Sequence, residues 1–212
     1  DASDNLSKDT ESAEIWSRMV APDHILPGSK KDNFWEMGET GPCGPCSEIF
    51  FDQGESLSCG KSGCDVGCDC DRYVEFWNLV FMEFEQRADG SRVPLPKPSI
   101  DTGMGLERIS AIVAGVPSNY DTDLFTPIFH ELEKITAKNY AKASEEEQVS
   151  FRVIADHIRA ITFLIGDGVA PSNDGRGYVL RRILRRAMRH GRKIGLSHHG
   201  LSELSATVVS QM

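Results

Sequence analysis

The chain has 212 residues, of which 40% are hydrophobic and 26% are charged, and its formal net charge is −9. This composition is ordinary for a soluble globular protein and excludes a collagen, a long disordered tail and a disulfide mini-protein. No run approaches the roughly 18 apolar residues of a membrane span, and the polar, acidic start does not resemble a signal peptide. We therefore predict a cytoplasmic protein with no membrane partner. Because the chain begins with Asp1 instead of Met, we expect a fragment of something longer.

The N-terminal part of the chain predicts only short elements. Apolar residues at helical spacing indicate a helix over residues 13–20, which Pro22 ends. Residues 32–37 and 48–51 are short apolar runs around Gly-Pro turns. The strongest pattern of the first half comes later, after a cysteine-rich stretch.

Residues 73–84 are the clearest strand in the sequence, because they are rich in aromatic and β-branched side chains. Their alternation places Asn78 and Val80 on one face. A turn is predicted at residues 88–90, and the prolines of residues 94–98 predict an extended linker.

After the linker the apolar spacing becomes helical. It predicts four amphipathic helices, over residues 106–113, 124–136, 151–165 and 177–194. Asp121 or Thr122 can cap the second helix and Ser150 the third, while residues 145–147 read as a solvated acidic connector. We predict an α+β protein with a boundary near Pro117, in which a β-rich domain (1–117) precedes an all-helical one (118–212).

All six cysteines fall within residues 43–70, which we expect to form a cysteine-rich insertion. They are Cys43, Cys46, Cys59, Cys64, Cys68 and Cys70. Clustered cysteines without a secretory signal indicate a metal site before disulfides, and zinc requires four ligands. Reduced thiols in a loop and disulfides remain alternatives, and the set of four ligands is undetermined. A redox role rests on the Cys-x-x-Cys at its start alone.

A glycine-rich turn precedes the first of these helices, in the order Asp101, Gly103, Gly105, Arg108. Glycine lets a backbone approach a ligand closely, and a helix N-terminus attracts anions. An arginine there offers a planar fork for phosphate or a base. The pattern is neither a Rossmann fingerprint nor a P-loop. It fits either contact with a nucleotide or a tight strand-to-helix turn.

The last predicted helix is strongly basic. Residues 176–193 hold seven Arg, one Lys and no acid, so the segment carries +8 and the rest of the chain −17. Such segregation is typical of binding to a phosphate backbone, although the arginines can instead pair with acidic residues of the chain. In the loop before it, Ser172 or Asn173 is placed either as a helix cap or as a polar group that reads a base edge.

Several of these segments together resemble bacterial alanyl-tRNA synthetases, a class II family. The resemblance covers nearly the whole chain from residue 32 to residue 191. It is carried in order by DNFWEMGETGPCGPCSEIFFD (32–52), DRYVEFWNLVFMEF (71–84), PLPKPSIDTGMGLERI (94–109), SNYDTDLF (118–125) and FRVIADHIRAITFLIGDGVAPSNDGRGYVLRRILRRAMRHG (151–191).

The resemblance implies an antiparallel-sheet catalytic domain that activates alanine with ATP and Mg²⁺ and passes it to the 3′ end of its tRNA. It implies an alanine pocket formed by Trp35, Asn78, Val80, Asp101 and Gly103. Asp101, as a buried carboxylate, would hold the substrate ammonium. It also implies ATP contacts from Gly103, Gly105 and Arg108.

The same resemblance implies that the helical part recognises the tRNA acceptor stem. Asn173 matches a residue that reads a G·U wobble pair there. The arginines that would follow the stem backbone are Arg181, Arg182, Arg185 and Arg186.

Two departures from the family pattern matter. Some relatives carry Cys-x₂-Cys-x₆-His-x₂-His, whereas this chain has Gln53 and Ser56 where the histidines would fall. The chain also lacks the first two class II motifs, as well as the editing portion. We therefore expect half an ATP site and an isolated chain that is inactive, and a zinc-stabilised RNA-binding module without catalysis is the alternative function.

Overall fold

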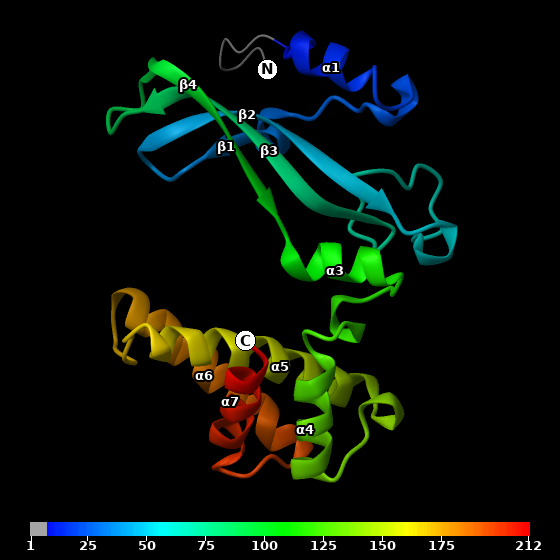
Figure 1. Ribbon diagram of the computed structural model, residues 1–212, viewed down its shortest axis with the longest axis vertical. Coiled ribbons are helices and arrows are strands. Elements are labelled where there is room, and N and C mark those ends of the chain that lie inside the picture. The colour runs from blue at the N-terminus through cyan, green and yellow to red at the C-terminus, as the bar shows by residue number, and fades with distance from the viewer. Residues whose placement is uncertain (1–7) are drawn as a thin grey trace. The chain divides into compact units, whose positions relative to one another are not determined.

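The computed structural model describes residues 8–212, and the chain forms two compact units (Figure 1). The first, which we call the sheet unit, ends at Ile112, and the second, the helical unit, comprises Val113–Met212. An antiparallel sheet followed by a group of helices confirms the predicted α+β class. Of the helices described, none has both the length and the apolar character that a membrane crossing requires.

The sheet unit is built on a four-stranded antiparallel sheet in the order β1-β2-β3-β4. Its elements are α1 (Thr10–Trp16), a 3₁₀ turn (Pro22–His24), α2 (Lys30–Asn33), β1 (Phe34–Glu36), β2 (Gly41–Asp52), a second 3₁₀ turn (Glu55–Leu57), β3 (Tyr73–Gln86), β4 (Arg92–Met104) and α3 (Leu106–Ala114). Each strand pairs with the one that follows it in the chain. The long connection is the one between β2 and β3, which contains four of the cysteines.

The central strand β3 confirms the strand predicted at residues 73–84. Its aromatic and β-branched side chains pack well on a pleated surface. The turn predicted at residues 88–90 connects it to β4, and the amide of Gly90 donates to the carbonyl of Arg87 at 2.9 Å. Gly90 has a φ of +80°, a conformation that glycine adopts without steric cost.

The predicted proline linker is wrong, because residues 94–98 belong to β4. A proline cannot donate to a β-ladder and is therefore tolerated on an edge strand or at an irregularity. β4 is an edge strand, and its register with β3 shifts between Met82 and Phe84. Pro96 and Pro98 fall within this shift and have no Cα partner on β3.

Helix α1 is shorter than the pattern over residues 13–20 predicts. It begins after Asp9, whose carboxylate accepts from the amide of Ser12 at 2.9 Å. It ends at Trp16, whose indole Nε1 donates to the hydroxyl of Ser47 on β2 at 3.2 Å. Beyond that anchor the apolar residues lack a surface to pack on, and Met19 is 66% exposed.

The helical unit buries most of the chain's core. Its elements are a 3₁₀ turn (Asn119–Asp121), α4 (Thr126–Thr136), a second 3₁₀ turn (Tyr140–Lys142), α5 (Glu145–Gly166), α6 (Gly175–Ile194) and α7 (Gly200–Gln211). Leu132, Ile154, Ile194 and Leu204 come from the four helices in turn, and each is 0% exposed in one shared cluster. This core holds α6 as a rigid element.

The predicted N-cap of α4 is wrong. The helix that we expected at residues 124–136 begins at Thr126 after Phe125, and neither Asp121 nor Thr122 caps it. The side-chain hydroxyl of Thr122 instead donates to the carbonyl of Asn119 at 2.6 Å within the preceding 3₁₀ turn. The hydroxyl of Thr122 is therefore used in that turn and is not available to cap α4.

Helix α5 begins six residues before the predicted start, so the expected acidic connector is its first turn. Ser144 is the N-cap and forms a reciprocal capping box with Glu147. Acidic residues are favourable there because the N-terminus of a helix carries partial positive charge. Ser150, the predicted cap, is fully buried and contacts Nδ1 of His190 on α6 at 3.0 Å.

We predict that Ser144→Ala destabilises the helical unit by about 0.5–2 kcal/mol, because the amide of Glu147 loses its acceptor. Urea unfolding followed by far-UV circular dichroism measures the change. Ser210→Ala in the last turn of α7 is the matched control and should change stability little. Equal effects of the two substitutions would contradict the assigned cap.

Candidate functional site

The register of β3 with β4 brings together four of the residues predicted to bind alanine. Asn78 pairs with Gly103, and Val80 pairs with Asp101. Residues directly opposite in an antiparallel pair project to the same face, with Cα atoms about 4.5–5.5 Å apart. The four residues therefore form a two-by-two block on one face of the sheet, which we call the β3–β4 block.

Strand β2 extends this block by two residues. Cys46 pairs with Val80, and Glu48 pairs with Asn78. The sequence analysis missed Glu48, although its position two residues after Cys46 places it on the same face of a strand. A carboxylate thus lies beside the predicted alanine site.

The side-chain amide of Asn78 has a hydrogen-bond partner at its nitrogen atom only. Its Nδ2 donates to Oε1 of Glu48 at 3.4 Å, while its buried Oδ1 has no hydrogen-bond partner among the described residues. A buried polar atom without a partner carries a free-energy cost. Beside it, a Cβ added to Gly103 would meet no atom within 4 Å. A buried acceptor without a partner and the open space at Gly103 therefore lie in paired positions on the same face of the sheet.

Asp101 differs from the expectation of a buried carboxylate, because its side chain is exposed on the edge strand β4. Its Oδ1 accepts from the amide of Thr102 at 2.8 Å. That bond orients the carboxylate and leaves its other oxygen available. The block therefore carries a negative charge at its open side.

Trp35 lies outside the regular block. It lies on β1, where it pairs with Gly44 of β2, and β1 is two strands from β3 and thus about 10 Å away. The register of β2 shifts between Cys43 and Cys46, which interrupts the pattern between Trp35 and the block. The sheet places Trp35 nearby and does not bring it into contact by pairing.

The glycine-rich turn that contains Gly103 and Gly105 connects β4 to α3. It is therefore the strand-to-helix turn that one of the two interpretations predicted. The amide of Gly105 donates to the carbonyl of Phe76 at 3.0 Å, and α3 starts at the next residue. Arg108 extends back to β3, where it donates to the carbonyl of Glu75 and lies 3.4 Å from its carboxylate. Its side chain is 46% exposed, so part of the guanidinium remains open to a ligand.

The structure separates the six cysteines into two groups. The Sγ atoms of Cys59, Cys64, Cys68 and Cys70 all lie within 4.8 Å of one another in the β2–β3 connection. Cys43 and Cys46 are instead buried in β2, where burial raises the pKa of both thiols. In the loop, the backbone amide of Arg72 lowers the pKa of Cys70 to about 7.

The arginines of α6 all lie on the exposed side of the helix. Its buried residues are Gly177, Leu180, Ala187, Gly191 and Ile194, which pack toward the core. Arg181, Arg182, Arg185 and Arg186 are exposed, and none of them forms an ion pair with a carboxylate in the described residues. Lys193 at the end of the helix does pair, with Glu146 at 2.5 Å. The helical unit by itself therefore gives these four arginines no carboxylate at ion-pair distance among the described residues, although, besides the hydrogen bond from His157, the charge of Arg186 contributes to lowering the pKa of Asp156.

Asn173 is exposed and is not a helix cap. The N-cap of α6 is Asp174, and the hydroxyl of Ser172 donates to the Asp174 carbonyl at 2.8 Å. The loop is held against the helix, since a Cβ on Gly177 would come within 2.5 Å of the carbonyl oxygen of Ala170. Asn173 therefore projects from a fixed loop at the start of the basic helix.

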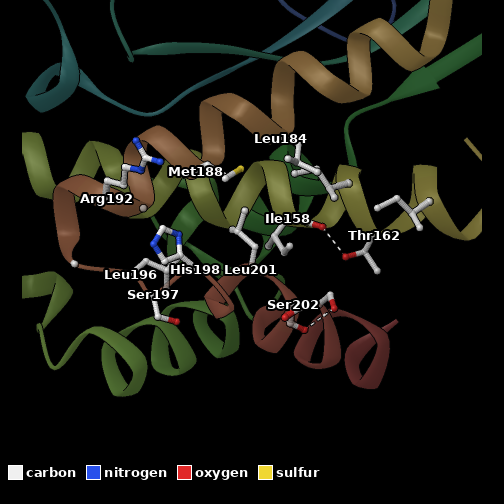
Figure 2. Close-up of a pocket in the computed structure, with 15 residues that line it drawn as sticks. Ile158, Thr162, Leu184, Met188, Arg192, Leu196, Ser197, His198, Leu201 and Ser202 are labelled. Carbon is white, nitrogen blue, oxygen red and sulfur yellow. Dashed lines mark hydrogen bonds between the residues drawn. The ribbon is translucent and has the colours of Figure 1, made fainter. Parts of the chain in front are cut away.

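A pocket of about 720 Å³ lies between α5, α6 and α7, and it contains none of the predicted site residues (Figure 2). Ile158, Leu184 and Leu201 give it an aliphatic lining. The hydroxyls of Thr162 and Ser202 are already used, because they donate at 2.7 Å to the carbonyls of Ile158 and of His199, the N-cap of α7. The other polar side chains of its lining are Arg192, Ser197, His198 and Ser205.

Glu48 lies in a place that is unfavourable for a carboxylate. Burial raises its pKa, and the neighbouring charges of Glu75 and Asp32 raise it further. The carboxylates therefore repel one another beside Asn78. Such a place is favourable for a cation and unfavourable for a further anion.

Known proteins match this chain over nearly its whole length. A family profile described as tRNA synthetases class II (A) matches residues 3–212. The chain is 53% identical over 98% of its length to an alanine–tRNA ligase of Anaeromyxobacter sp. (strain Fw109-5). It is 54% identical over 97% of its length to that of Desulfosudis oleivorans, and 56% over 96% to that of Lawsonia intracellularis. It spans only about a quarter of each relative, between 23% and 24%.

We predict that Glu48→Gln stabilises the sheet unit at neutral pH, by less than about 1 kcal/mol because the carboxyl is partly exposed. The native pKa of Glu48 is raised, so its stabilising contribution is fully present at low pH and is lost as pH rises through that pKa. The advantage of the glutamine should therefore vanish in mild acid.

Tryptophan fluorescence during urea unfolding measures this change, because Trp16, Trp35 and Trp77 all belong to the sheet unit. Glu83→Gln, at an exposed position of β3, is the control. An effect of Glu48→Gln that is the same at both pH values would be incompatible with the raised pKa.

Proposed function

We propose a function from one premise: the chain belongs to the class II (A) family of tRNA synthetases. We propose that it is the part of a cytoplasmic alanine–tRNA ligase that binds alanine, contacts ATP and begins the surface for tRNA. Residues 1–117 would be a partial catalytic domain, and residues 118–212 the start of the tRNA-recognition region. The remaining catalytic and editing functions would reside in parts of the enzyme outside this sequence.

The β3–β4 block is the observation that carries the proposal. An alanine ammonium needs acceptors, and the block presents the Oδ1 of Asn78 and the carboxylate of Asp101 on the same face. Because Nδ2 of Asn78 donates to Glu48, the atom without a partner among the described residues is the oxygen, an acceptor that suits an ammonium group. Hydrogen bonds between charged groups are stronger than neutral ones.

The side chains of the block also limit the size of the substrate. Val80 is 7% exposed between Cys46 and Asp101, and Gly103 leaves open space beside it. Val80 and Trp35 would bound a space for a methyl group. Such a pocket cannot strongly reject glycine or serine, because one small group changes binding by about 1–3 kcal/mol. This limit explains why such an enzyme needs a separate editing site.

Arg108 is the residue of this chain best placed to contact ATP. Its side chain packs against Gly105, and the space beside Gly103 would leave room for a phosphate or an adenine face. Mg²⁺, when bound, neutralises phosphate charge. Glu48 and Glu75 are the carboxylates near this turn that would hold it, and Arg108 is the cation that now contacts Glu75. The catalytic contribution of the chain is positioning and charge stabilisation.

The basic helix α6 would follow the backbone of the tRNA acceptor stem. Its exposed arginines at 181, 182, 185 and 186 lack ion-pair partners in the described structure, so their charge is available to phosphates. Asn173 projects at the start of this helix and can offer both a donor and an acceptor to a base edge. We assign it the reading of the G·U pair.

A zinc-stabilised RNA-binding module without catalysis is the alternative. That function requires only α6 and the cysteine loop. It gives no role to the Oδ1 atom of Asn78 or to the exposed carboxylate of Asp101. A test at Asp101 therefore separates the two functions.

We predict that Asp101→Asn raises the KM for alanine about 10- to 100-fold and changes the KM for ATP little, because a charged hydrogen bond contributes about 1.5–3 kcal/mol. Asparagine keeps the acceptor for the Thr102 amide, so the fold should persist. The assay is alanine-dependent pyrophosphate exchange by an enzyme of the relatives' full length that carries this segment.

Asp89→Asn is the control for that experiment, since Asp89 lies in the β3–β4 turn and bonds Ser91. Equal losses for alanine and ATP would count against Asp101 as the ammonium partner. An unchanged KM for alanine would also count against that role, and an unsubstituted protein that shows no alanine-dependent exchange would favour the RNA-binding alternative.

We predict that Arg181→Glu combined with Arg185→Glu weakens tRNA binding and lowers the slope of log affinity against log salt by about 2, one for each lost phosphate contact. The same double charge reversal at Lys134 and Lys142, which lie elsewhere in the helical unit, is the control. A slope that does not differ between the two variants would show that α6 does not contact the backbone.

A further inference from the structure

We infer that the β2–β3 connection is a structural zinc module, in which one ion is bound by the thiolates of Cys59, Cys64, Cys68 and Cys70. The module lies outside the β3–β4 block, and the argument for it does not depend on the proposed ligase function. It takes a metal of the class that prefers four sulfur ligands in a tetrahedron.

The spacing of the four sulfur atoms fits this class of site. A Zn–S bond of about 2.3 Å in a tetrahedron places the sulfurs about 3.8 Å apart. The Sγ atoms of Cys59 and Cys68 are 3.5 Å apart, those of Cys64 and Cys70 are 3.4 Å apart, and all four lie within 4.8 Å. A disulfide requires about 2.05 Å, so neither pair is at bonding distance.

Two similar turns present two of the ligands. In Lys-Ser-Gly-Cys the amide of Cys64 donates to the carbonyl of Lys61, and in Asp-Val-Gly-Cys the amide of Cys68 donates to that of Asp65. Gly63 has a φ of +88° and Gly67 a φ of +97°. Such turns require glycine at their third position, so the sequence Gly-Cys is what directs each thiol inward.

The stem of the loop is fixed independently of the cysteines. Arg72 forms a two-pronged ion pair with Asp52, at 2.9 Å from Nε to Oδ1 and 3.0 Å from Nη2 to Oδ2. The amide of Gln53 donates to the carbonyl of Arg72 at 2.8 Å. The two ends of the connection are therefore held together, and only its distal part needs a further constraint.

No hydrophobic core supplies that constraint. Of the residues between Gln53 and Arg72, all described, none is buried, and Leu57 and Val66 are the large apolar side chains. The conformational entropy of ordering such a loop is of the order of 1–2 kcal/mol per residue. Metal coordination is the interaction that small domains without a core use to offset it.

Cys43 and Cys46 are excluded as ligands by their position. Both lie within β2, and Cys46 pairs with Val80 in the ladder. The pair of cysteines that resembles a metal motif in the sequence therefore belongs to the sheet. The module has the spacing Cys-x₄-Cys-x₃-Cys-x-Cys, without histidine.

The test begins with the full chain purified under reducing conditions without chelator. Native mass spectrometry and elemental analysis should find one zinc ion per chain. Alkylation mapped by peptide mass should leave the four loop thiols unreactive until a chelator is added. Trypsin should cut after Lys61 only after chelation, because the turn that holds it would be released.

Three results would overturn the inference: four loop thiols that react at once in a metal-free chain, iron in place of zinc, or disulfides Cys59–Cys68 and Cys64–Cys70. These measurements use the wild-type chain, so they do not depend on whether a variant folds.

Variants identify the ligands. Cys64→Ser should lose most of the bound zinc, whereas Cys43→Ser and Cys46→Ser should retain one ion per chain. With cobalt(II) in place of zinc, the wild-type chain and both β2 variants should show the visible bands of a tetrahedral thiolate complex. Zinc that survives Cys64→Ser and is lost with Cys43→Ser would place the site in the sheet and refute the inference.

Discussion

The hydrogen-bonded pairing of β3 with both of its neighbours is the constraint on which the sheet unit depends. Buried hydrophobic side chains are few in this unit, where Val80 is the one buried residue of β3 among those described. The ladder itself must therefore fix the positions of the functional groups. A shift of one residue would move Asn78 and Val80 to the other face of the sheet. The register thus determines both the fold and the proposed alanine site.

The two units are stabilised by different interactions. The helical unit has a continuous core that fixes α6, so its arginines can remain exposed and unpaired without loss of structure. The sheet unit instead places small and polar groups at an open face, and it relies on local ties such as Asn78 to Glu48 and Arg72 to Asp52. A site for a small charged substrate needs such ordered polar groups. A surface for a phosphate backbone needs mainly unneutralised charge.

The sequence predicted the elements whose pattern is strong. Strand β3 and helix α6 were confirmed, because aromatic and β-branched side chains favour a strand and a buried apolar face fixes the period of the helix. The predictions failed where tertiary contacts decide the structure. The prolines of residues 94–98 are tolerated in β4 because that strand lies at an edge of the sheet. The first turn of α5 was missed because its residues are polar and give no apolar periodicity. Helix α7 (Gly200–Gln211) was not predicted, since serine and threonine interrupt its apolar stripe. The residues of the site were predicted by resemblance. The position of Glu48 and the exposure of Asp101 depend on pairing across the sheet, which the spacing of residues does not encode. The separation of four cysteines from the other two depends on the turns of the loop.

The most direct test of the central claim is a crystal structure of a full-length enzyme carrying this segment, bound to a non-hydrolysable alanyl-adenylate analogue. We expect the ammonium group to lie between Oδ1 of Asn78 and the carboxylate of Asp101, with the methyl group against Val80 and the nucleotide beside Arg108. An analogue bound with its ammonium away from the β3–β4 block would contradict the claim that strand register builds the alanine site.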